Sequence, residues 1–269
     1  MRYAICNETF GDWDHARVCE RVAELGYTGL EIAPFTLAPL ITDVTAARRA
    51  ELRRQAESAG VKIIGLHWLL AKTTGFHLTS PDPAVRKATA DYFIELARCA
   101  AELGGDILVL GSPLQRKIPD GFTAAQSEDF AIDCLSGVLK TLDDTGVKLC
   151  LEPLTPKETD FMTTAASAVR MIGRLGHPLV KLHLDAKAMA AESESRADVI
   201  RANAAHTYHF HANDENLRGP GTGAVDFRPI FAALNETAYG GWVSVEVFDY
   251  TPDPDTIARD SIRYMRDCE

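Results

Sequence analysis

The chain has 269 residues, of which 46% are hydrophobic and 25% are charged, and these are the proportions of an ordinary globular protein. They exclude a disordered, a collagen-like and a disulfide-scaffold protein. The 38 acidic residues outnumber the 28 basic ones, which gives a formal net charge of −10, and no long basic run offsets this excess. Because nucleic acids and anionic membranes are bound by clustered Lys and Arg, we expect neither as a partner.

The first residues and the cysteines indicate a cytoplasmic protein. The start of the chain carries acidic residues and lacks the apolar run of a secretory signal, and nowhere do about 18 apolar residues follow one another. The six cysteines are scattered and form no C-x-x-C pair. We therefore expect buried, reduced thiols rather than zinc or redox chemistry at these positions.

Short apolar runs alternate with longer amphipathic stretches along the whole chain, which is typical of repeated β-α units. The apolar runs are short and rich in Val, Ile and Leu, as buried parallel strands are. Eight strands are predicted, and these are Arg2–Cys6, Gly29–Ala33, Val61–Trp68, Asp106–Leu110, Val147–Leu151, Leu179–Asp185, Thr207–His211 and Trp242–Val247.

The stretches between the strands are predicted to be helices, such as Asp82–Leu103 and Ala124–Asp144, the latter opened by a capping box of Thr123 and Gln126. Eight β-α units without a Pro-rich or Gly/Ser-rich linker predict one α/β domain over residues 1–269, a single closed (β/α)8 TIM barrel. The alternative is an open doubly wound sheet. That fold usually has a Gly-rich turn after its first strand, and here the turn reads NETFGDWD.

Polar residues end most of the predicted strands, and in such a barrel the reacting groups lie at the carboxyl ends of the strands. The last four strands end in Glu152, Asp185, His211 and Glu246, which neighbouring strands would bring into one cavity. Three crowded carboxylates would raise one another's pKa unless a cation neutralised them. This donor set suits one divalent ion, with Mn²⁺ as the first choice and Mg²⁺, Co²⁺ or Zn²⁺ as the others.

Four segments in the second half of the chain resemble motifs of the xylose isomerase-like barrels, and within them of the ketose 3-epimerases of the tagatose/psicose type. The segments are LEPLTPKET, HLDAKAM, HFHANDENLRGPGTG and VSVEVF. The resemblance implies the same four metal ligands, with Glu152 also as a catalytic carboxylate. It implies that Glu158 contacts substrate oxygens, that Arg218 binds the substrate, and that the protein forms a dimer or tetramer.

Other residues near the predicted ligands are candidates for contacts with the substrate or for orienting a ligand. The family commonly has a histidine three residues after the aspartate, where this chain has Ala188, and Lys187 is the candidate to replace it. His67, at the end of the third strand, is also predicted to contact the substrate. His183 and His209 precede the predicted ligands on their strands by two residues, and each would either orient a ligand or pack in the core.

The predicted chemistry follows from what a keto sugar requires. Epimerisation or isomerisation removes a proton next to a carbonyl, and a metal ion stabilises the enediolate that forms. Glu152 and Glu246, facing each other across the substrate, would act as base and acid. We therefore predict a metal-dependent sugar isomerase or ketose 3-epimerase with a small carbohydrate substrate. The sequence does not separate epimerisation from aldose–ketose isomerisation.

Two alternatives stay open, and a third is disfavoured. A metal-dependent dehydratase of the inosose or dehydroshikimate type would also begin with proton abstraction next to a carbonyl. A sugar-binding barrel without turnover would be compatible with the missing histidine. A zinc endonuclease would need further histidines where the chain has Gly111 and Ala188, and the net charge of −10 also argues against it.

Two further groups have both a functional and a plain structural interpretation. Arg116 and Lys117 lie on the loop after the fourth strand, where a solvated loop is slightly favoured over a site for a phosphate or carboxylate. Trp13, Trp68 and Phe248 would form an apolar wall for a sugar face or pack in the core.

Overall fold

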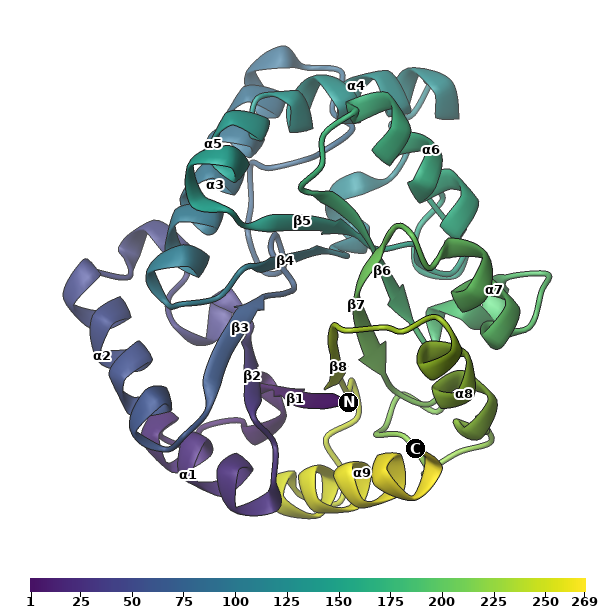
Figure 1. Ribbon diagram of the computed structural model, residues 1–269. Coiled ribbons are helices and arrows are strands. Elements are labelled where there is room, and N and C mark those ends of the chain that lie inside the picture. Colours follow the sequence, from purple (N-terminus) through teal and green to yellow (C-terminus); the bar gives the residue numbers. More distant parts are fainter.

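The computed structural model describes residues 1–269 and shows a closed barrel in which eight parallel strands follow one another in sequence order (Figure 1). The last strand pairs with the first, which closes the sheet. The predicted TIM barrel is therefore confirmed. The strands are β1 (Arg2–Cys6), β2 (Gly29–Ile32), β3 (Lys62–Leu66), β4 (Ile107–Leu110), β5 (Lys148–Leu151), β6 (Val180–Asp185), β7 (Thr207–Ala212) and β8 (Trp242–Val245).

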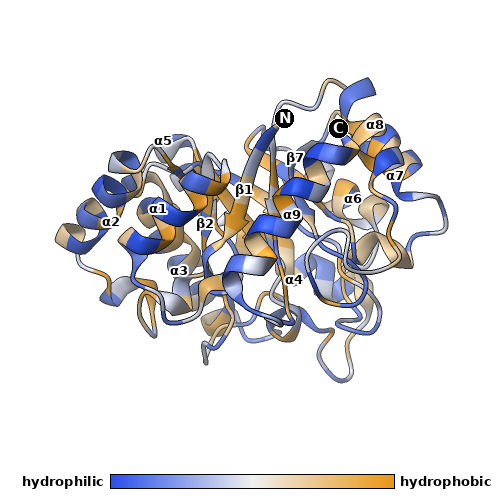
Figure 2. Cartoon of the chain, turned by 90° about the horizontal axis from the view of Figure 1, so that it is seen from below, coloured by the Kyte–Doolittle hydropathy of each residue, from blue (hydrophilic) through white to orange (hydrophobic).

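Helices surround the barrel, with their hydrophilic residues outward and the most hydrophobic chain in the strands at the centre (Figure 2). None of these helices is both long and apolar enough to cross a membrane. They are α1 (His15–Leu25), α2 (Ala46–Ser58), α3 (Pro83–Glu102), α4 (Ala124–Ser136), α5 (Leu139–Thr145), α6 (Ala165–Leu175), α7 (Arg196–Asn203), α8 (Arg228–Glu236) and α9 (Pro254–Cys268).

The predicted helix Ala124–Asp144 is in fact two helices. Its start is as expected, because the backbone amide of Gln126 donates to Thr123 and that of Thr123 to Gln126. Gly137 then caps α4, and its amide donates to the carbonyls of Cys134 and Leu135 rather than continuing the α-helical ladder. Glycine has a low helix propensity, so the break falls at this residue.

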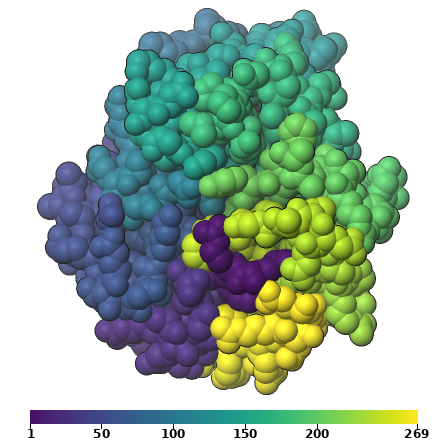
Figure 3. Space-filling model, viewed as in Figure 1, coloured from purple at the N-terminus to yellow at the C-terminus, as the bar shows by residue number.

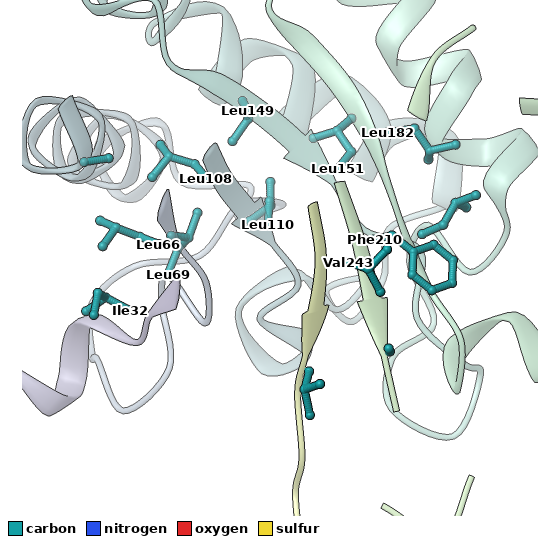
Figure 4. Close-up of a cluster of buried hydrophobic side chains, with 14 of the residues drawn as sticks. Ile32, Leu66, Leu69, Leu108, Leu110, Leu149, Leu151, Leu182, Phe210 and Val243 are labelled. Carbon is teal, nitrogen blue, oxygen red and sulfur yellow. The ribbon is translucent and has the colours of Figure 1, made fainter. Parts of the chain in front are cut away.

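The strands separate two apolar cores. Leu108 and Leu110 belong to a cluster of 67 buried residues between the sheet and the helices, part of which is shown in Figure 4. Ile107 and Val109, which alternate with them along β4, belong to a cluster of only six residues inside the barrel. The inner cluster also contains Ala4 from β1, near the amino end of the barrel. The carboxyl end of the barrel is thereby left to polar side chains.

The two ends of the chain meet at one face of the molecule. The amino group of Met1 forms an ion pair with the Glu269 side chain, and the Tyr3 hydroxyl donates a 2.7 Å hydrogen bond to the same carboxylate. In Figure 3 the start of the chain, in purple, lies beside the yellow C-terminal helix. These contacts hold the end of α9 against the start of β1.

Candidate functional site

A buried carboxylate on β2 fixes two histidines of β7. Glu31 is fully buried, and its Oε2 lies 2.9 Å from Nε2 of His209 and 3.1 Å from Nε2 of His211. Burial alone would raise the pKa of Glu31, but the two imidazoles hold it well below its usual value. With Nε2 of His211 engaged in this way, Nδ1 faces Glu246 at 3.2 Å. A carboxylate behind an imidazole is the usual support of a metal-binding histidine.

Glu246 follows the last residue of β8, and its carboxylate lies within hydrogen-bond distance of Trp68, His67 and His211. Its Oε1 accepts a 2.6 Å hydrogen bond from the indole of Trp68 and lies 3.2 Å from Nδ1 of His67. The other nitrogen of His67 lies 2.9 Å from Glu8. Burial lowers the pKa of His67, yet Glu8 and Glu246 together raise it well above its usual value. His67 therefore lies between two carboxylates that favour its charged form.

Glu152, Asp185 and His211 converge together with His183. One ligand atom of each residue lies within 4.8 Å of the others, and all four residues are buried. Metal–ligand bonds are about 2.0–2.6 Å long, so one ion can reach ligand atoms at this separation. Burial raises the pKa of Glu152 well above its usual value, and Glu246 and Asp185 add to this shift. The residues fit a divalent cation, whose charge would offset the repulsion between the carboxylates.

Gly111, directly after β4, makes room for the Glu152 carboxylate. A Cβ atom at this position would lie 2.2 Å from Oε2 of Glu152, so any side chain would displace that carboxylate. On the other side of the site, Asn213 donates a 2.6 Å hydrogen bond to Oδ2 of Asp185. The orientation of both carboxylates is thus set by their neighbours.

A cavity of about 340 Å³ opens above these residues and is lined by Glu152, Glu158 and Glu246 on its polar side. Trp68 and Phe248 form its apolar side, with ring centroids 5.7 Å apart and an interplanar angle of 24°. Two of the three aromatic residues considered for such a wall therefore face the cavity, and their contact with a sugar stays a prediction. Trp13 is not part of the lining and packs on Phe10 instead.

Lys187 lies at the site, but it is not part of the strand that the sequence predicts for it. The alternation of a strand would place it beside Asp185, but β6 ends at Asp185 and Lys187 has helical angles of φ −68° and ψ −45°. Its Nζ nevertheless donates a 2.7 Å hydrogen bond to Glu158 and lies 4.2 Å from the ring centroid of Phe248. Ala188 contributes its backbone amide, which donates to Asp185 at 2.6 Å.

Arg218 is not among the residues that line the cavity. Its Nε donates a 2.7 Å hydrogen bond to Asp249. The backbone amides of Phe248 and Asp249 both donate to the carbonyl of Leu217, which ties this loop to the chain after β8. The predicted contact between Arg218 and a substrate stays a prediction.

The interpretation of Arg116 as a solvated loop residue was wrong. The side chain is 1% exposed, and its Nη1 donates to the backbone carbonyls of Glu152 at 2.7 Å and Leu110 at 3.3 Å. It therefore supports the backbone at Glu152, and a contact between Arg116 and a substrate phosphate or carboxylate stays a prediction. Lys117 is exposed, as a solvated loop residue would be.

Two supporting residues, Glu8 and Asn213, were missed in the sequence, and each lies within two residues of the end of a strand. Glu31, one residue before the end of β2, stands out in the sequence as a polar residue near a strand end, but no role could be assigned to it. Their roles depend on partners from other strands. Such long-range pairs have no local signature in the sequence.

A closed barrel that gathers buried carboxylates and imidazoles at the carboxyl ends of its strands is the architecture of a metal-dependent barrel enzyme. Residues 19–268 match the family model described as xylose isomerase-like TIM barrel, and the chain belongs to this family. This confirms the resemblance in the sequence.

The similar proteins include several sugar epimerases. The D-psicose 3-epimerase of Agrobacterium fabrum is 32% identical over 85% of this chain and 78% of its own length. The D-psicose 3-epimerase of Ruminiclostridium cellulolyticum is 29% identical over 87% and 78%. A crystal structure of a D-psicose 3-epimerase in the presence of D-fructose has a TM-score of 0.88 and 25% identity, and covers 100% of this chain and 99% of its own. The predicted class, a sugar isomerase or epimerase, is confirmed.

Proposed function

We propose that this protein is a metal-dependent ketose 3-epimerase that acts on a small carbohydrate. The observation that carries the proposal is the buried group of Glu152, Asp185 and His211, with Glu246 beside it, at the wall of a cavity of about 340 Å³. The activities named for the similar proteins support the same reaction.

We assign the metal site to Glu152, Asp185, His211 and Glu246, with Mn²⁺ as the expected ion and Mg²⁺, Co²⁺ or Zn²⁺ as alternatives. A divalent ion bound there supplies a Lewis acid that stabilises negative charge on the substrate oxygens. Glu31 holds His211 in place, and His67 holds Glu246.

Glu152 and Glu246 are the proposed proton carriers, and their surroundings differ. Glu246 is hydrogen-bonded by Trp68 and by two imidazoles, which hold its pKa well below its usual value although burial raises it. Glu152 has no such side-chain donor within hydrogen-bond distance, and burial raises its pKa. A pair of carboxylates whose surroundings separate their pKa values is suited to act as base and acid in one reaction.

The remaining contacts to the substrate are assigned to residues around the cavity. Glu158 lines it, and Lys187 is paired with Glu158 at the position where we expect it to replace the family histidine. His67 is assigned to the substrate site through its contact with Glu246, and Arg218 is assigned as a substrate-binding residue from outside the lining of the cavity. Trp68 and Phe248 would pack against an apolar face of the sugar.

The experiment is a panel of ketoses, aldoses and their phosphates, incubated with the Mn²⁺-loaded protein in D₂O and followed by NMR. A 3-epimerase will convert a ketose into its C3 epimer and place deuterium at C3. An aldose product would show isomerisation, and a product that has lost water would show a dehydratase. Sugar binding without any exchange would show a barrel that does not catalyse, and each of these three results would overturn the proposal.

We further propose that residues 1–269 form one domain that acts in the cytoplasm as a dimer or tetramer. All six cysteines are free thiols and five of them are buried, which supports a reducing compartment. Light scattering on the purified protein will give the number of subunits.

A further inference from the structure

The least satisfied polar side chain of the barrel interior is His183 on β6. It is fully buried, and neither of its ring nitrogens has a hydrogen-bond partner. The other three histidines of the interior each lie within 3.2 Å of a carboxylate oxygen. Because a buried nitrogen without a partner costs stability, both unpaired nitrogens of His183 need an explanation.

His183 lies on the same side of β6 as the metal site. It precedes Asp185 by two residues on this strand, and alternate residues of a strand point to the same face. The pairing with β7 shifts register through one extra residue on β7, so that Leu182 lies opposite Thr207 and His183 opposite His209. The His183 ring is 4.2 Å from the ring of His211, centroid to centroid.

The distances around His183 fit a shared ion better than a hydrogen bond. Its Nε2 lies 3.8 Å from Oε1 of Glu152, which is too long for a hydrogen bond. Two ligands of one ion, each with a bond of about 2.0–2.2 Å, can lie at this distance from each other. His183 also belongs to the group with Glu152, Asp185 and His211 whose ligand atoms lie within 4.8 Å of one another.

We propose that His183 is a further ligand of the divalent ion, so that the site has two imidazole ligands. This inference rests on the metal site of the proposed function and adds to the four ligands assigned there. Imidazole is a poor ligand for Mg²⁺ and a good one for Co²⁺ and Zn²⁺. The second imidazole therefore shifts the preference of the site away from Mg²⁺.

The test counts the nitrogen atoms bound to Mn²⁺ in the full-length protein by pulsed electron paramagnetic resonance. We expect two directly bound nitrogens in the wild type and one in His183→Ala and His183→Gln. The matched control is His209→Gln, which removes a buried imidazole whose Nε2 is 2.9 Å from Glu31, and it will keep two.

Calorimetry with Mn²⁺, Co²⁺ and Mg²⁺ gives a second readout that needs no substrate. Loss of a residue that only orients a ligand costs about 10–100-fold in metal affinity, so loss of His183 as a ligand will weaken Mn²⁺ binding by at least about 100-fold. The affinity for Co²⁺ will fall more than that for Mg²⁺. In His183→Gln the amide can donate to Glu152 but cannot replace an imidazole, so the loss will persist.

Two results would overturn the inference and leave the proposed function standing. One is a single bound nitrogen in the wild type, a measurement that does not depend on whether a variant folds. The other is near wild-type Mn²⁺ affinity in His183→Gln, which would make His183 a hydrogen-bond donor that positions Glu152. A wild-type protein that binds no divalent ion would overturn the metal site and the proposed function as well.

Discussion

Nζ of Lys187 donates a 2.7 Å hydrogen bond to Oε1 of Glu158, so two residues that the sequence predicts as separate substrate contacts form one ion pair. The Lys187 side chain is 9% exposed and that of Glu158 is 27% exposed, and Glu158 lines the cavity. Burial lowers the pKa of Lys187, but Asp185 and Glu158 raise it above its usual value, so the ammonium stays charged. Glu158 thus fixes the ammonium of Lys187, a positive charge, at the edge of a site rich in carboxylates.

The first prediction concerns this charge. Lys187→Met will lower kcat by about 100-fold, because removal of one donor that stabilises charge in a transition state costs about that much. The exposed Lys117→Met, on a loop of the same chain, is the control and will have wild-type kinetics. Steady-state rates on the substrate identified in D₂O will check it. If Lys187→Met is kinetically silent, Lys187 does not replace the family histidine.

The second prediction concerns the two proton carriers. Glu152→Gln and Glu246→Gln will each lower kcat by about 10²–10⁴-fold, because each substitution removes a group that carries a proton. Circular dichroism will show an intact fold in both. Glu24→Gln, whose side chain is 65% exposed on α1, serves as the control and will be fully active. Either active-site variant with bound metal and a near wild-type rate would exclude its carboxylate as an acid or base.

The barrel and the residues at its strand ends could be predicted because both depend on local patterns. A buried parallel strand has a short apolar run, and the residue after that run falls at the carboxyl end of the barrel, which located Glu152, Asp185, His211 and Glu246. The break at Gly137 was missed because the apolar period of the helix continues across it. Only the geometry of the turn at Gly137 shows that the helix ends.

The connections within the site could not be predicted in the same way. His211 and Glu31 are 180 residues apart, and nothing near either of them shows that they meet. Arg116 was misjudged because its partners are the backbone carbonyls of Leu110 and Glu152, which a pattern of side chains does not reveal. Contacts between residues that lie on different strands depend on how the whole barrel closes.

The third prediction tests the space beside Glu152. In Gly111→Ala the new Cβ would lie 2.2 Å from Oε2 of Glu152, so the carboxylate must move. Because misplacement of a catalytic group by about 1 Å can cost about 100-fold, kcat will fall by about that factor. Gly173→Ala on α6 is the control, since a Cβ there meets nothing within 4 Å, and it will be active and slightly more stable. A fully active Gly111→Ala would show that Glu152 does not need its observed position.

The fourth prediction separates a structural from a substrate-binding role of Arg116. Arg116→Met will lower the free energy of unfolding by about 2 kcal/mol, because it removes the charged donor to the buried carbonyl of Glu152, while the carbonyl of Leu110 keeps the amide of Glu152 as a donor. The KM for sugar phosphates will change no more than the KM for the free sugars. Thermal unfolding and kinetics on both kinds of sugar will check this. A selective rise of KM for phosphates would support the phosphate-binding interpretation.

The fifth prediction concerns pH and a pair of helices. Glu128 on α4 accepts hydrogen bonds from Arg170 at 2.6 Å and Arg174 at 3.0 Å, both on α6. The hydrogen bond from Arg170 is the main cause that holds the pKa of Glu128 below its usual value. A group whose pKa is lower in the folded state stabilises the fold above its unfolded pKa of about 4.5, and this contribution disappears as the pH falls through the folded value.

Glu128→Gln will therefore be less stable than the wild type by about 1 kcal/mol at pH 7, a value typical of partly exposed ion pairs. The difference will shrink below about pH 4.5 and vanish once Glu128 is protonated in the folded protein. Asp129→Asn is the matched control, because Asp129 pairs with the same Arg174 but is 64% exposed, and it will change stability by less than about 0.5 kcal/mol. Urea unfolding at several pH values will measure both variants. A difference for Glu128→Gln that stays constant down to pH 3 would mean that packing of the side chain, and not its charge, holds α4 against α6.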